Sequence, residues 1–577
     1  GGGGGEHQQS QQQLKYIGNK NISQSKILSD HVLLNKQSIG PFSPSKAFYT
    51  YHDNGDSKDK NNWITINHDI YGTRYSNQTV IEKDNVANLQ VKWRLINDVE
   101  IQDSPIIIGD KGYVQDYAGN IIAFDNGNGK ILWKVHVGTG PTMGLTFNSG
   151  IVFASTGYNA TVVAVNATDG KIVWQSPLLG NPKSGYNIPS VPIVWKDFVV
   201  VGSAAGGDVA NGVGYVQGNI TALNATDGKI KWNRQTTSGE WVKHGKAPPF
   251  NGDASAWSDG ALDPETGIIY MPLGSPSPNF NSSTRQQTPN LYANHMIAVN
   301  ITNGNIVWAT PFIDYGTALP VKVPDTHDWD TSWGSSISKV TFDNGTQKKI
   351  IIGHDKMGNI MAMDASTGKE IWWNTLGTQN NTDAIPSSNG SGMIWSYGIF
   401  NYHAVDNSDG TLYIAATNRG VNYFTDSNEG GGVAGHRIAA PHTIEQGLLN
   451  GTIAAMDLKT GKVKWQYKTE FPPRVSPLVT NNILFAGYIP FSENIKENTK
   501  HVTTTKYGVI LALDKQTGKK LWEFDVHAPI SPVGPSIGNG MLFVPTGKIQ
   551  IGDFGKPKGS FPQGAIGQGS IVAFGLP

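Results

Sequence analysis

Seven side chains outside the repeated units of this chain could together do acid–base and anion-binding chemistry. In chain order they are Trp257, His327, Asp330, Trp333, Lys356, Trp395 and Arg419. The carboxylate can transfer a proton, and the three basic side chains can bind an anion. The three indoles can form apolar walls that exclude water and strengthen those contacts. These residue types point to a site that binds a small anion and handles one proton.

Each of these residues also has an ordinary structural use. An Asp such as Asp330 often caps a turn, a Lys such as Lys356 is usually a solvated surface charge, and a Trp such as Trp257 usually packs in a core. Trp257 and Trp395 fall in the two longest gaps between repeated units. Because functional residues are often carried by loops on a rigid scaffold, the scaffold has to be identified first.

The scaffold is defined by a strand–turn–strand unit that occurs seven times. The units are FDNGNGKILW (124–133), VNATDGKIVW (165–174), LNATDGKIKW (223–232), VNITNGNIVW (299–308), MDASTGKEIW (363–372), MDLKTGKVKW (456–465) and LDKQTGKKLW (513–522). Just before each unit stands an apolar run with an Ala, which leads into a turn in which Gly supplies a positive φ and Asx or Thr side chains bond the local backbone. The Trp then lies on the following strand.

An eighth unit is divided between the two ends of the chain. SIVAFGLP ends the sequence with the Ala strand, at Ala573, and lacks the turn and the Trp. NLQVKW supplies Trp93 without a preceding Ala strand. Pairing these two strands would close a ring and leave no open sheet edge. The sequence thus predicts an all-β, eight-bladed β-propeller of four-stranded antiparallel blades, whose last blade is closed by the N- and C-terminal strands.

An open β-solenoid or a string of β-sandwiches could also be built from such units. The spacing between successive Ala positions varies from 41 residues (Ala123 to Ala164) to 93 residues (Ala362 to Ala455), whereas a solenoid stacks near-identical rungs. We therefore favour the propeller. We expect it to span residues 61–577 as a single domain, after a flexible or surface-docked N-terminal arm at residues 1–60.

The composition excludes several classes of function. The 577 residues include no Cys, which excludes thiolate metal sites and Cys nucleophiles, and no apolar run is long enough to cross a bilayer. The formal net charge is zero, and no basic run or helix-opening Gly-rich loop is present. Nucleic-acid and nucleotide binding therefore have no support.

The same composition favours a location outside the cell. Twelve Asn-x-Ser/Thr sequons, from Asn21 to Asn450, are candidate sites for N-linked glycans. Charged residues make up only 16% of the chain, so acidification would neutralise few carboxylate pairs and create limited repulsion. We expect a secreted, extracellular or cell-surface protein, with its signal peptide removed, that tolerates acid and forms a homo-oligomer.

Beyond residue 60 the chain resembles the pyrroloquinoline quinone (PQQ) dehydrogenases. The resemblance is carried by the Asp-x-x-Thr-Gly-Lys-x-x-Trp repeats, by HDIYGTRYSNQTVIEKDNVANLQVKW (68–93) and by ASAWSDGALDPETGIIYMPLGSPSPN (254–279). It implies that Trp257 stacks on the cofactor, that Asp330 is the catalytic aspartate and that Lys356 is the basic residue beside it.

Other residues of that family are missing from this chain. The family's cofactor clamp of adjacent cysteines, followed by an Arg that holds the cofactor's carboxylates, is matched by VGTGPTMG (137–144), which contains neither. Where the family has Ca²⁺ ligands, the chain has Ser275 in place of Asn, only Asp208 in the Glu-bearing segment, and Ile394 in place of the Asn before Trp395. We therefore expect no bound PQQ and no calcium or other metal.

The chain also resembles a second family on this scaffold, the extracellular tetrathionate hydrolases of acidophilic sulfur oxidisers, which do not depend on the quinone. The lost clamp, the retained Asp330, the absence of Cys and the low charge all look like that group. The prediction is a hydrolase that converts tetrathionate, a small inorganic sulfur anion, to thiosulfate, sulfur and sulfate. Asp330 and Lys356 would be catalytic, and the substrate would be bound by Trp257, His327, Trp333, Trp395 and Arg419.

The protonation state of Asp330 is left open by the sequence. An ionised carboxylate would activate water, whereas a neutral one would protonate the leaving sulfur species. Two other functions also stay open: a PQQ- and Ca²⁺-dependent dehydrogenase of an alcohol or a sugar, and a non-catalytic extracellular propeller used for assembly.

Overall fold

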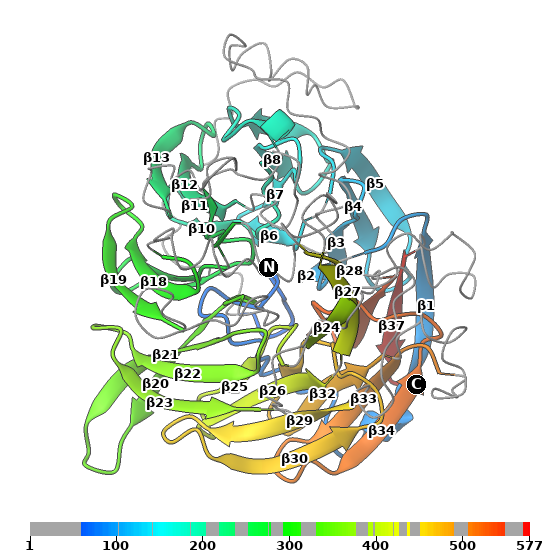
Figure 1. Ribbon diagram of the computed structural model, residues 1–577. Helices are drawn as coiled ribbons and strands as arrows, with labels where there is room; N and C mark the ends of the chain where they lie inside the picture. Colours follow the sequence, from blue (N-terminus) through cyan, green and yellow to red (C-terminus); the bar gives the residue numbers. More distant parts are fainter. Residues whose placement is uncertain are drawn as a thin grey trace.

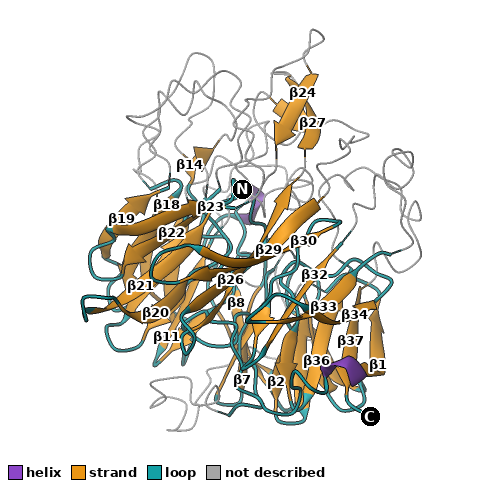
Figure 2. Ribbon diagram, turned by 90° about the horizontal axis from the view of Figure 1, so that it is seen from below, coloured by secondary structure: helices purple, strands orange, loops and turns teal. Residues whose placement is uncertain are grey.

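The computed structural model contains eight four-stranded antiparallel sheets around a central axis, which confirms the predicted fold (Figure 1). It describes residues 59–101, 103–140, 142–184, 186–203, 218–236, 252–274, 276–277, 292–312, 330–376, 391–395, 398–418, 420–425, 436–438, 450–489, 506–547 and 569–577. Figure 1 looks along the axis, where the blades follow one another in chain order, and Figure 2 turns the ring by 90°.

In the first four blades, the strands follow one another in chain order from the innermost strand to the outermost. Blade 1 is β2 (Ile106–Ile108), β3 (Lys111–Gln115), β4 (Asn120–Asp125) and β5 (Ile131–His136); blade 2 is β6 (Leu145–Asn148), β7 (Ile151–Ser155), β8 (Val162–Asn166) and β9 (Ile172–Gln175). Blade 3 is β10 (Ile193–Trp195), β11 (Phe198–Gly202), β12 (Asn219–Asn224) and β13 (Ile230–Gln235); blade 4 is β15 (Ala261–Asp263), β16 (Ile268–Pro272), β18 (His295–Asn300) and β19 (Ile306–Pro311).

The remaining blades complete the ring. Blade 5 is β20 (Ser336–Thr341), β21 (Gln347–His354), β22 (Asn359–Asp364) and β23 (Glu370–Thr375); blade 6 is β25 (Ala404–Asp406), β26 (Thr411–Asn418), β29 (Asn450–Asp457) and β30 (Val463–Thr469). Blade 7 is β31 (Leu478–Val479), β32 (Ile483–Tyr488), β33 (Val509–Asp514) and β34 (Lys520–Asp525); blade 8 is β35 (Ser536–Gly538), β36 (Met541–Thr546), β37 (Gly569–Gly575) and β1 (Gln90–Asn97).

A few short elements lie outside the blades. They are the 3₁₀ turns η2 (Val86–Asn88) and η3 (Pro182–Ser184), the pair β14 (Gly252–Asp253) with β17 (Pro276–Ser277), and the small sheet of β24 (Ser391–Trp395), β27 (Gly420–Thr425) and β28 (His436–Ile438). Within the described residues, no helix is long and apolar enough to span a membrane.

Burial explains the composition of the strands. The third strand of a blade packs against the neighbouring blades on both faces, so β33 (VILALD) is buried along its whole length and is apolar up to its last residue, Asp514. The fourth strand has one face toward solvent, and β30 accordingly alternates between half-buried and exposed side chains up to its last residue. The repeated units therefore place their Ala in the buried strand and their Trp in the half-exposed one.

Each turn between a third and a fourth strand packs against a tryptophan of the preceding blade. In blade 1, the Gly129 amide donates to the Asp125 carbonyl at 2.8 Å, and Gly129 has a φ of +78°. A Cβ on Gly129 would lie 2.5 Å from the indole of Trp93, which comes from blade 8. Trp93 Nε1 also donates to the Asn126 carbonyl in this turn, at 2.9 Å. The glycine therefore both permits the turn and makes room for the indole.

This contact is repeated around the ring. The indole N–H donates to a turn carbonyl of the next blade in the pairs Trp93–Asn126, Trp133–Ala167, Trp174–Ala225, Trp232–Ile301, Trp308–Ala365, Trp372–Leu458 and Trp465–Lys515. In all seven pairs the turn glycine lies against the ring of the donating Trp. The sequence repeat therefore encodes the interface between blades as well as the fold of each blade.

Blade 8 closes the ring with strands from both ends of the chain, as predicted. β1 pairs antiparallel with β37, and Trp93 lies opposite Ala573. The same register places Ala123 opposite Trp133 within blade 1. The divided unit therefore has the same strand pairing as the seven continuous units.

The segment formed by residues 61–76 crosses the axis and hydrogen-bonds to seven of the eight blades. Its main-chain partners are Asn539, Ile107, Phe147, Leu262, Ile337, Val405 and Val479. Near its end the buried Arg74 donates to three carbonyls, those of Ile66, Pro477 and Pro535. The sequence-based limits begin the propeller at residue 61 but do not predict this axial role. Residues 1–58 lie outside the described part of the chain, so the predicted N-terminal arm stays a prediction.

Two buried histidines lie side by side where blades 5 and 6 meet. His354 Nε2 is 2.9 Å from His403 Nδ1, and His403 Nε2 is 2.6 Å from Ser336 Oγ. Burial lowers the pKa of His403 to about 3. Burial and the neighbouring His403 hold the pKa of His354 well below its usual value. Both rings are therefore neutral near pH 7, and this pair opposes the acid tolerance expected from the low surface charge.

We expect Gly461→Ala to destabilise the protein more than Gly410→Ala, a matched change in the same blade. Both glycines have positive φ, so each Ala costs about 1–2 kcal/mol of backbone strain. A Cβ at Gly461 would lie 2.4 Å from the indole of Trp372, whereas one at Gly410 has no atom within 4 Å. Displacing the indole should add roughly 1–3 kcal/mol. Denaturation midpoints measure the difference, and equal losses would contradict the interlock between blades.

We expect His403 to make the protein lose stability between pH 6.5 and pH 3. Because the pKa of His403 is lowered to about 3 in the folded state, the unfolded chain binds the proton first as the pH falls below about 6.5. Its contribution to the free energy of unfolding is full above that pH and is lost toward pH 3. His403→Gln removes this titration, so the melting temperature of the variant should fall less between pH 7 and pH 4. A parallel fall in both proteins would show that His403 is not responsible.

Candidate active site

Four of the predicted site residues come from loops at one end of the ring. Antiparallel strands alternate in direction, so the loop before each innermost strand and the loop between its second and third strands lie at the same end. Trp257 precedes β15, and Asp330 and Trp333 precede β20. Lys356 lies between β21 and β22. Blades 4 and 5 therefore bring these four side chains to the axis together.

A fully buried ion pair forms the centre of this cluster. Lys356 Nζ lies 2.8 Å from Asp330 Oδ2, and both side chains have no exposed surface. Trp257 Nε1 donates to the same carboxylate oxygen at 3.1 Å. Lys356 Nζ also lies 5.2 Å from the centroid of the Trp257 ring. The carboxylate, the ammonium and the indole thus form one compact unit, because a buried carboxylate needs charged and hydrogen-bonding partners.

The backbone around the ion pair is held as tightly as the side chains. The Lys356 amide donates to the Asp330 carbonyl at 3.1 Å, and Thr331 forms an antiparallel bridge with Asp355. Gly274 comes from the neighbouring blade 4, and a Cβ there would lie 2.3 Å from Asp330 Oδ1. A residue with a Cβ at this position would clash with the Asp330 carboxylate, so the position requires glycine.

A column of three aromatic rings lies along the axis beneath the ion pair. The Trp257 and Trp333 rings meet edge to face, with centroids 5.4 Å apart, and Trp333 meets Tyr402 in the same way at 5.2 Å. Apolar side chains from other blades complete this cluster, among them Met143 and Val191. Such edge-to-face contacts hold the rings in defined orientations and keep water out.

A second buried charge cluster lies at the far end of the column. Tyr402 lies beside Asp259, which accepts hydrogen bonds from Asn67 Nδ2 at 3.2 and 3.3 Å. Arg74, from the axial segment, favours the ionised form of Asp259. The aromatic column therefore separates two buried carboxylates, each near one cation.

The two carboxylates differ in their affinity for protons. Burial by itself would raise the pKa of Asp330, but the ion pair with Lys356 outweighs it and lowers the pKa below the usual value. At Asp259 burial prevails and raises the pKa to about 6. Burial also lowers the pKa of Arg74 to about 9. Asp330 is therefore ionised at neutral pH and can act as a base.

The structure describes part of the predicted set of site residues. It brings Trp257, Asp330, Trp333 and Lys356 together. His327 and Arg419 lie outside the described residues. For Trp395, at the end of β24, only the backbone is described. The roles predicted for these three residues stay predictions.

Sequence reasoning missed two residues on the wall of the site. The buried Phe400 lies 5.8 Å from Lys356 Nζ, measured to the ring centroid, and the guanidinium of Arg474 lies 5.2 Å from the same centroid. Both residues precede an innermost strand, as Trp257 and Asp330 do. That shared position, and not a motif, is the signal that could have identified them.

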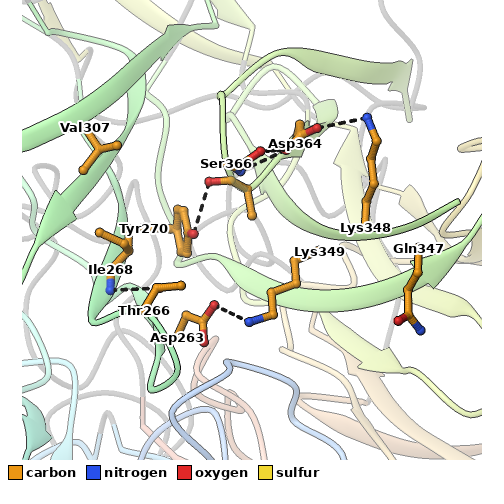
Figure 3. A pocket seen from close by; sticks show the side chains of 11 residues that line it. Asp263, Thr266, Ile268, Tyr270, Val307, Gln347, Lys348, Lys349, Asp364 and Ser366 are labelled. Carbon is orange, nitrogen blue, oxygen red and sulfur yellow. Dashed lines mark hydrogen bonds and ion pairs between the residues drawn. The ribbon is translucent and has the colours of Figure 1, made fainter.

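Two cavities of about 490 Å³ each lie at the other end of the ring, among the turns that join first to second strands. The one in Figure 3 lies between blades 4 and 5, and its ionic groups are already paired. Lys349 lies 2.7 Å from Asp263, and Lys348 lies 3.1 Å from Asp364. The second cavity shares Lys349 and Asp263 and borders residues 69–75. Neither cavity contains a predicted site residue.

Comparison with known proteins gives matches along most of the chain. The profile of the glucose/ethanol/alcohol dehydrogenase β-propeller domain matches residues 63–146 and 177–375, and that of the outer membrane protein assembly factor BamB matches residues 293–486. The putative dehydrogenase XoxF of Paracoccus denitrificans is 25% identical over 564 residues, covering 85% of this chain and 86% of that protein. The quinoprotein alcohol dehydrogenase PedH of Pseudomonas putida is 25% identical over 546 residues, covering 83% and 84%.

Solved structures share the fold. A europium-containing methanol dehydrogenase aligns with a TM-score of 0.70 at 18% identity, covering 90% of this chain and 99% of that chain. The quinohemoprotein alcohol dehydrogenase of Comamonas testosteroni aligns with a TM-score of 0.68 at 19% identity, covering 92% and 83%. At such identities the likeness establishes the fold and leaves the activity to other arguments.

These relatives bear on two sequence-based expectations, of which they correct the first. The expectation that no cofactor takes part was wrong, because the matched proteins include a quinoprotein, a quinohemoprotein and a europium-containing enzyme. The missing cysteine clamp and the altered calcium positions were too narrow a basis for that expectation. The tetrathionate hydrolase prediction finds no support among these four relatives, which are all named as dehydrogenases.

The fold, the repeated blade interface and the aligned relatives agree with one another. The matches extend through the segments that carry Trp257, Asp330 and Lys356. The chain belongs to the PQQ-dehydrogenase-like superfamily of eight-bladed β-propellers.

Proposed function

We propose that the protein is a quinone-dependent dehydrogenase that oxidises a hydroxyl group of an alcohol or a sugar. The observation that carries the proposal is the buried Asp330–Lys356 ion pair beside the Trp257 indole. An ionised carboxylate in an aromatic site that excludes water is suited to removing a proton from a substrate hydroxyl. The names of the relatives support the same class of reaction.

A quinone of the PQQ type fits the chemistry of the described residues. PQQ is a planar aromatic molecule that carries carboxylates, so it needs a flat apolar surface and nearby cations. Trp257 would provide the surface, and Lys356, whose Nζ lies 5.2 Å from the centroid of that ring, would provide one cation. Asp330 lies within reach of both, so a substrate beside the quinone would meet the base.

The described donors leave the metal site implied by the relatives unplaced. The described part of the chain contains no group of three or more His, Cys, Asp or Glu side chains placed to hold a metal. Ser275 and Asp208, which stand where the resemblance places calcium ligands, lie outside the described residues. No step of the proposed chemistry is therefore assigned to a metal.

In the proposed reaction the alcohol loses two hydrogens, the one on oxygen as a proton and one on carbon as a hydride. The quinone, when bound, supplies the acceptor for the hydride and its two electrons. Asp330 accepts the hydroxyl proton as the O–H and C–H bonds break and the carbon becomes a carbonyl. Lys356 keeps the carboxylate ionised and in place through the ion pair, and Trp257 and Trp333 keep water from the base.

We retain the location and assembly of the protein as further proposals. Its low charge and its sequons support a secreted, extracellular or cell-surface location with N-linked glycans, and the protein would act as a homo-oligomer. One sequon is unsuited to a glycan, because Asn219 is buried and accepts a hydrogen bond from the Tyr186 hydroxyl at 2.6 Å.

We expect Asp330→Asn to lower kcat by roughly 10²- to 10⁴-fold, because the amide cannot accept the hydroxyl proton. Quinone-loaded protein would be assayed with alcohols and sugars and an artificial electron-accepting dye. Asp84→Asn, at an exposed position, is the matched control. Circular dichroism and melting temperature check that the variant is folded, since it leaves the Lys356 charge without its partner.

Two outcomes would contradict the proposal. One is an Asp330→Asn variant with nearly wild-type dehydrogenase turnover. The other is release of thiosulfate from tetrathionate by quinone-free protein, lost in Asp330→Asn, which would establish a hydrolase instead.

We expect Lys356→Met to shift the acid limb of the kcat/KM profile to higher pH. The ion pair lowers the pKa of Asp330, so in the wild type the base stays ionised until the pH falls below the usual Asp value. Without the ammonium, burial raises that pKa and the base is protonated earlier as the pH falls. Profiles from pH 4 to pH 9 measure the shift, with the exposed Lys369→Met in the same blade as control. An unchanged limb would mean that Asp330 is not the titrating base.

A further inference from the structure

Asn294 ends the loop between the second and third strands of blade 4, at the same end of the ring as the buried ion pair. It is the last residue before β18, it is fully buried, and it has a φ of +54°. Positive φ is uncommon outside glycine, and Asn is among the few residues that adopt it readily. A buried non-glycine residue keeps such a conformation only where the surrounding structure imposes it, and these residues cluster at functional sites.

The main chain of Asn294 is bonded within blade 4, and its side chain reaches blade 5. Its amide donates to the Gly274 carbonyl at 2.9 Å, and its carbonyl accepts from the Phe312 amide at 2.8 Å. Its side-chain oxygen Oδ1 accepts from the amide of Thr331, the residue after Asp330, at 3.1 Å. Because Thr331 is fully buried, loss of this contact would leave its amide with neither this partner nor water.

The contact fixes the peptide group that follows Asp330. The N–H of this group is the Thr331 amide, which Asn294 binds, and its carbonyl is that of Asp330, which accepts from the Lys356 amide at 3.1 Å. A peptide group is planar, so hydrogen bonds to both of its polar groups hold the plane. The held plane limits the direction in which the Asp330 side chain can leave the main chain.

Blade 4 also bounds the carboxylate itself. Gly274, whose carbonyl binds the Asn294 amide, is the residue at which a Cβ would lie 2.3 Å from Asp330 Oδ1. Asn294 and Gly274 therefore act on the same side chain, one through the main chain of Asp330 and the other by its close approach. The 2.8 Å ion pair with Lys356 Nζ and the hydrogen bond from Trp257 both need the carboxylate in this place.

Blades 4 and 5 are also joined at points away from the base. The Trp308 indole donates to the Ala365 carbonyl at 2.9 Å, and the Ala261 amide donates to Ser335 Oγ at 2.9 Å. These bonds hold the two blades together without contacting a residue adjacent to Asp330. The contact of Asn294 is instead made to the residue that follows the base, which favours a role in positioning over one in blade assembly.

We infer that Asn294 is a positioning residue, which holds Asp330 where it can accept the proton of the substrate hydroxyl. The inference rests on the proposed function and adds to it a residue that acts through the main chain of the base. Proton transfer needs the two heavy atoms within hydrogen-bonding distance, and a displacement of about 1 Å can lower a rate by about 100-fold. Loss of the Asn294 side chain should therefore lower kcat more than it weakens substrate binding.

The variant Asn294→Gly removes the side chain and keeps the backbone, because glycine adopts positive φ without strain. In quinone-loaded protein we expect kcat to fall by about 10- to 100-fold and KM to change by less than about two-fold. Asn539→Gly is the matched control, since Asn539 also has a positive φ, of +46°, and its side chain donates to Asn126 at 2.8 Å in a turn outside the site. Its kcat should equal that of wild type.

A second measurement needs neither quinone nor turnover. Trp257 Nε1 donates to Asp330 at 3.1 Å, so the fluorine NMR signal of Trp257 in full-length, fluorotryptophan-labelled protein should follow the ionisation of Asp330. Trp257→Phe assigns that signal. Burial raises the pKa of Asp330, and the ion pair with Lys356 lowers it. A carboxylate displaced from Lys356 should therefore titrate at higher pH in Asn294→Gly than in wild type or in Asn539→Gly.

Asn294→Asp separates the hydrogen bond from the rest of the side chain. It keeps an acceptor oxygen for the Thr331 amide and tolerates positive φ, so its kcat at high pH should stay within about three-fold of wild type. Its added carboxylate opposes the ionisation of Asp330 and should move the acid limb of the kcat/KM profile to higher pH.

Either a wild-type kcat or an unshifted Asp330 titration in Asn294→Gly would overturn the inference. So would a loss of kcat in Asn294→Asp as large as that in Asn294→Gly. If Asn294→Gly does not fold, an acid limb in Asn294→Asp equal to that of wild type overturns the inference. Wild-type protein without dehydrogenase turnover would overturn the proposed function, and the fluorine titration would then decide by itself whether Asn294 positions Asp330.

Discussion

The contact between a turn glycine and the tryptophan of the preceding blade is the constraint on which the rest of this protein depends. It joins seven pairs of blades through the same hydrogen bond and the same close approach of ring and backbone. Because the indole can enter only where no Cβ exists, the contact sets how closely successive blades approach. The position of every loop at the axis follows from that spacing.

The candidate site depends on this regularity because no blade contains it alone. Trp257 comes from blade 4, Asp330 and Lys356 from blade 5, and Arg474 from blade 7. Their contacts are a few ångströms long, so small changes in blade spacing would separate them. The segment at residues 61–76 adds a second brace, since its hydrogen bonds connect seven blades across the axis. The rigid ring thus replaces the local packing that would position a site within one sheet.

The fold could be predicted from the sequence because the same residues do the same work in every blade. Gly129 and Trp93 are recognisable only as members of a series, and the series also explains why Trp93 and Ala573 must pair. Trp257, Asp330 and Lys356 could be found through resemblance to a family, since each lies in a matching motif. The same resemblance led to the wrong expectation that no cofactor is bound. A few altered cofactor and calcium positions were given more weight than the retained residues Trp257, Asp330 and Lys356.

Arg474, Phe400 and Arg74 could not be found in this way. Each occurs once, in a segment without periodicity, and its partners are far away in the sequence. Arg74 donates to the Pro477 carbonyl, a contact between residues that only ring closure brings together. The role of the axial segment could not be predicted either, because its contacts are mostly between main-chain groups and leave no pattern of side chains in the sequence. The features that the sequence does not reveal are therefore the contacts that form only where several blades meet at the axis.

The pairing of β1 with β37 also governs the order in which the protein can be made. β1 is synthesised before the first complete blade, yet its partner β37 is synthesised after the strands of all seven other blades. Until then one edge of the incomplete ring is open, and a strand at the other end has no neighbour. A nascent chain can assemble blades 1–7 in sequence but cannot complete blade 8, so the final step joins the two ends of a nearly finished molecule. A chain that lacks β37 would stay an open arc with unpaired strand edges, even with all of its active-site residues present.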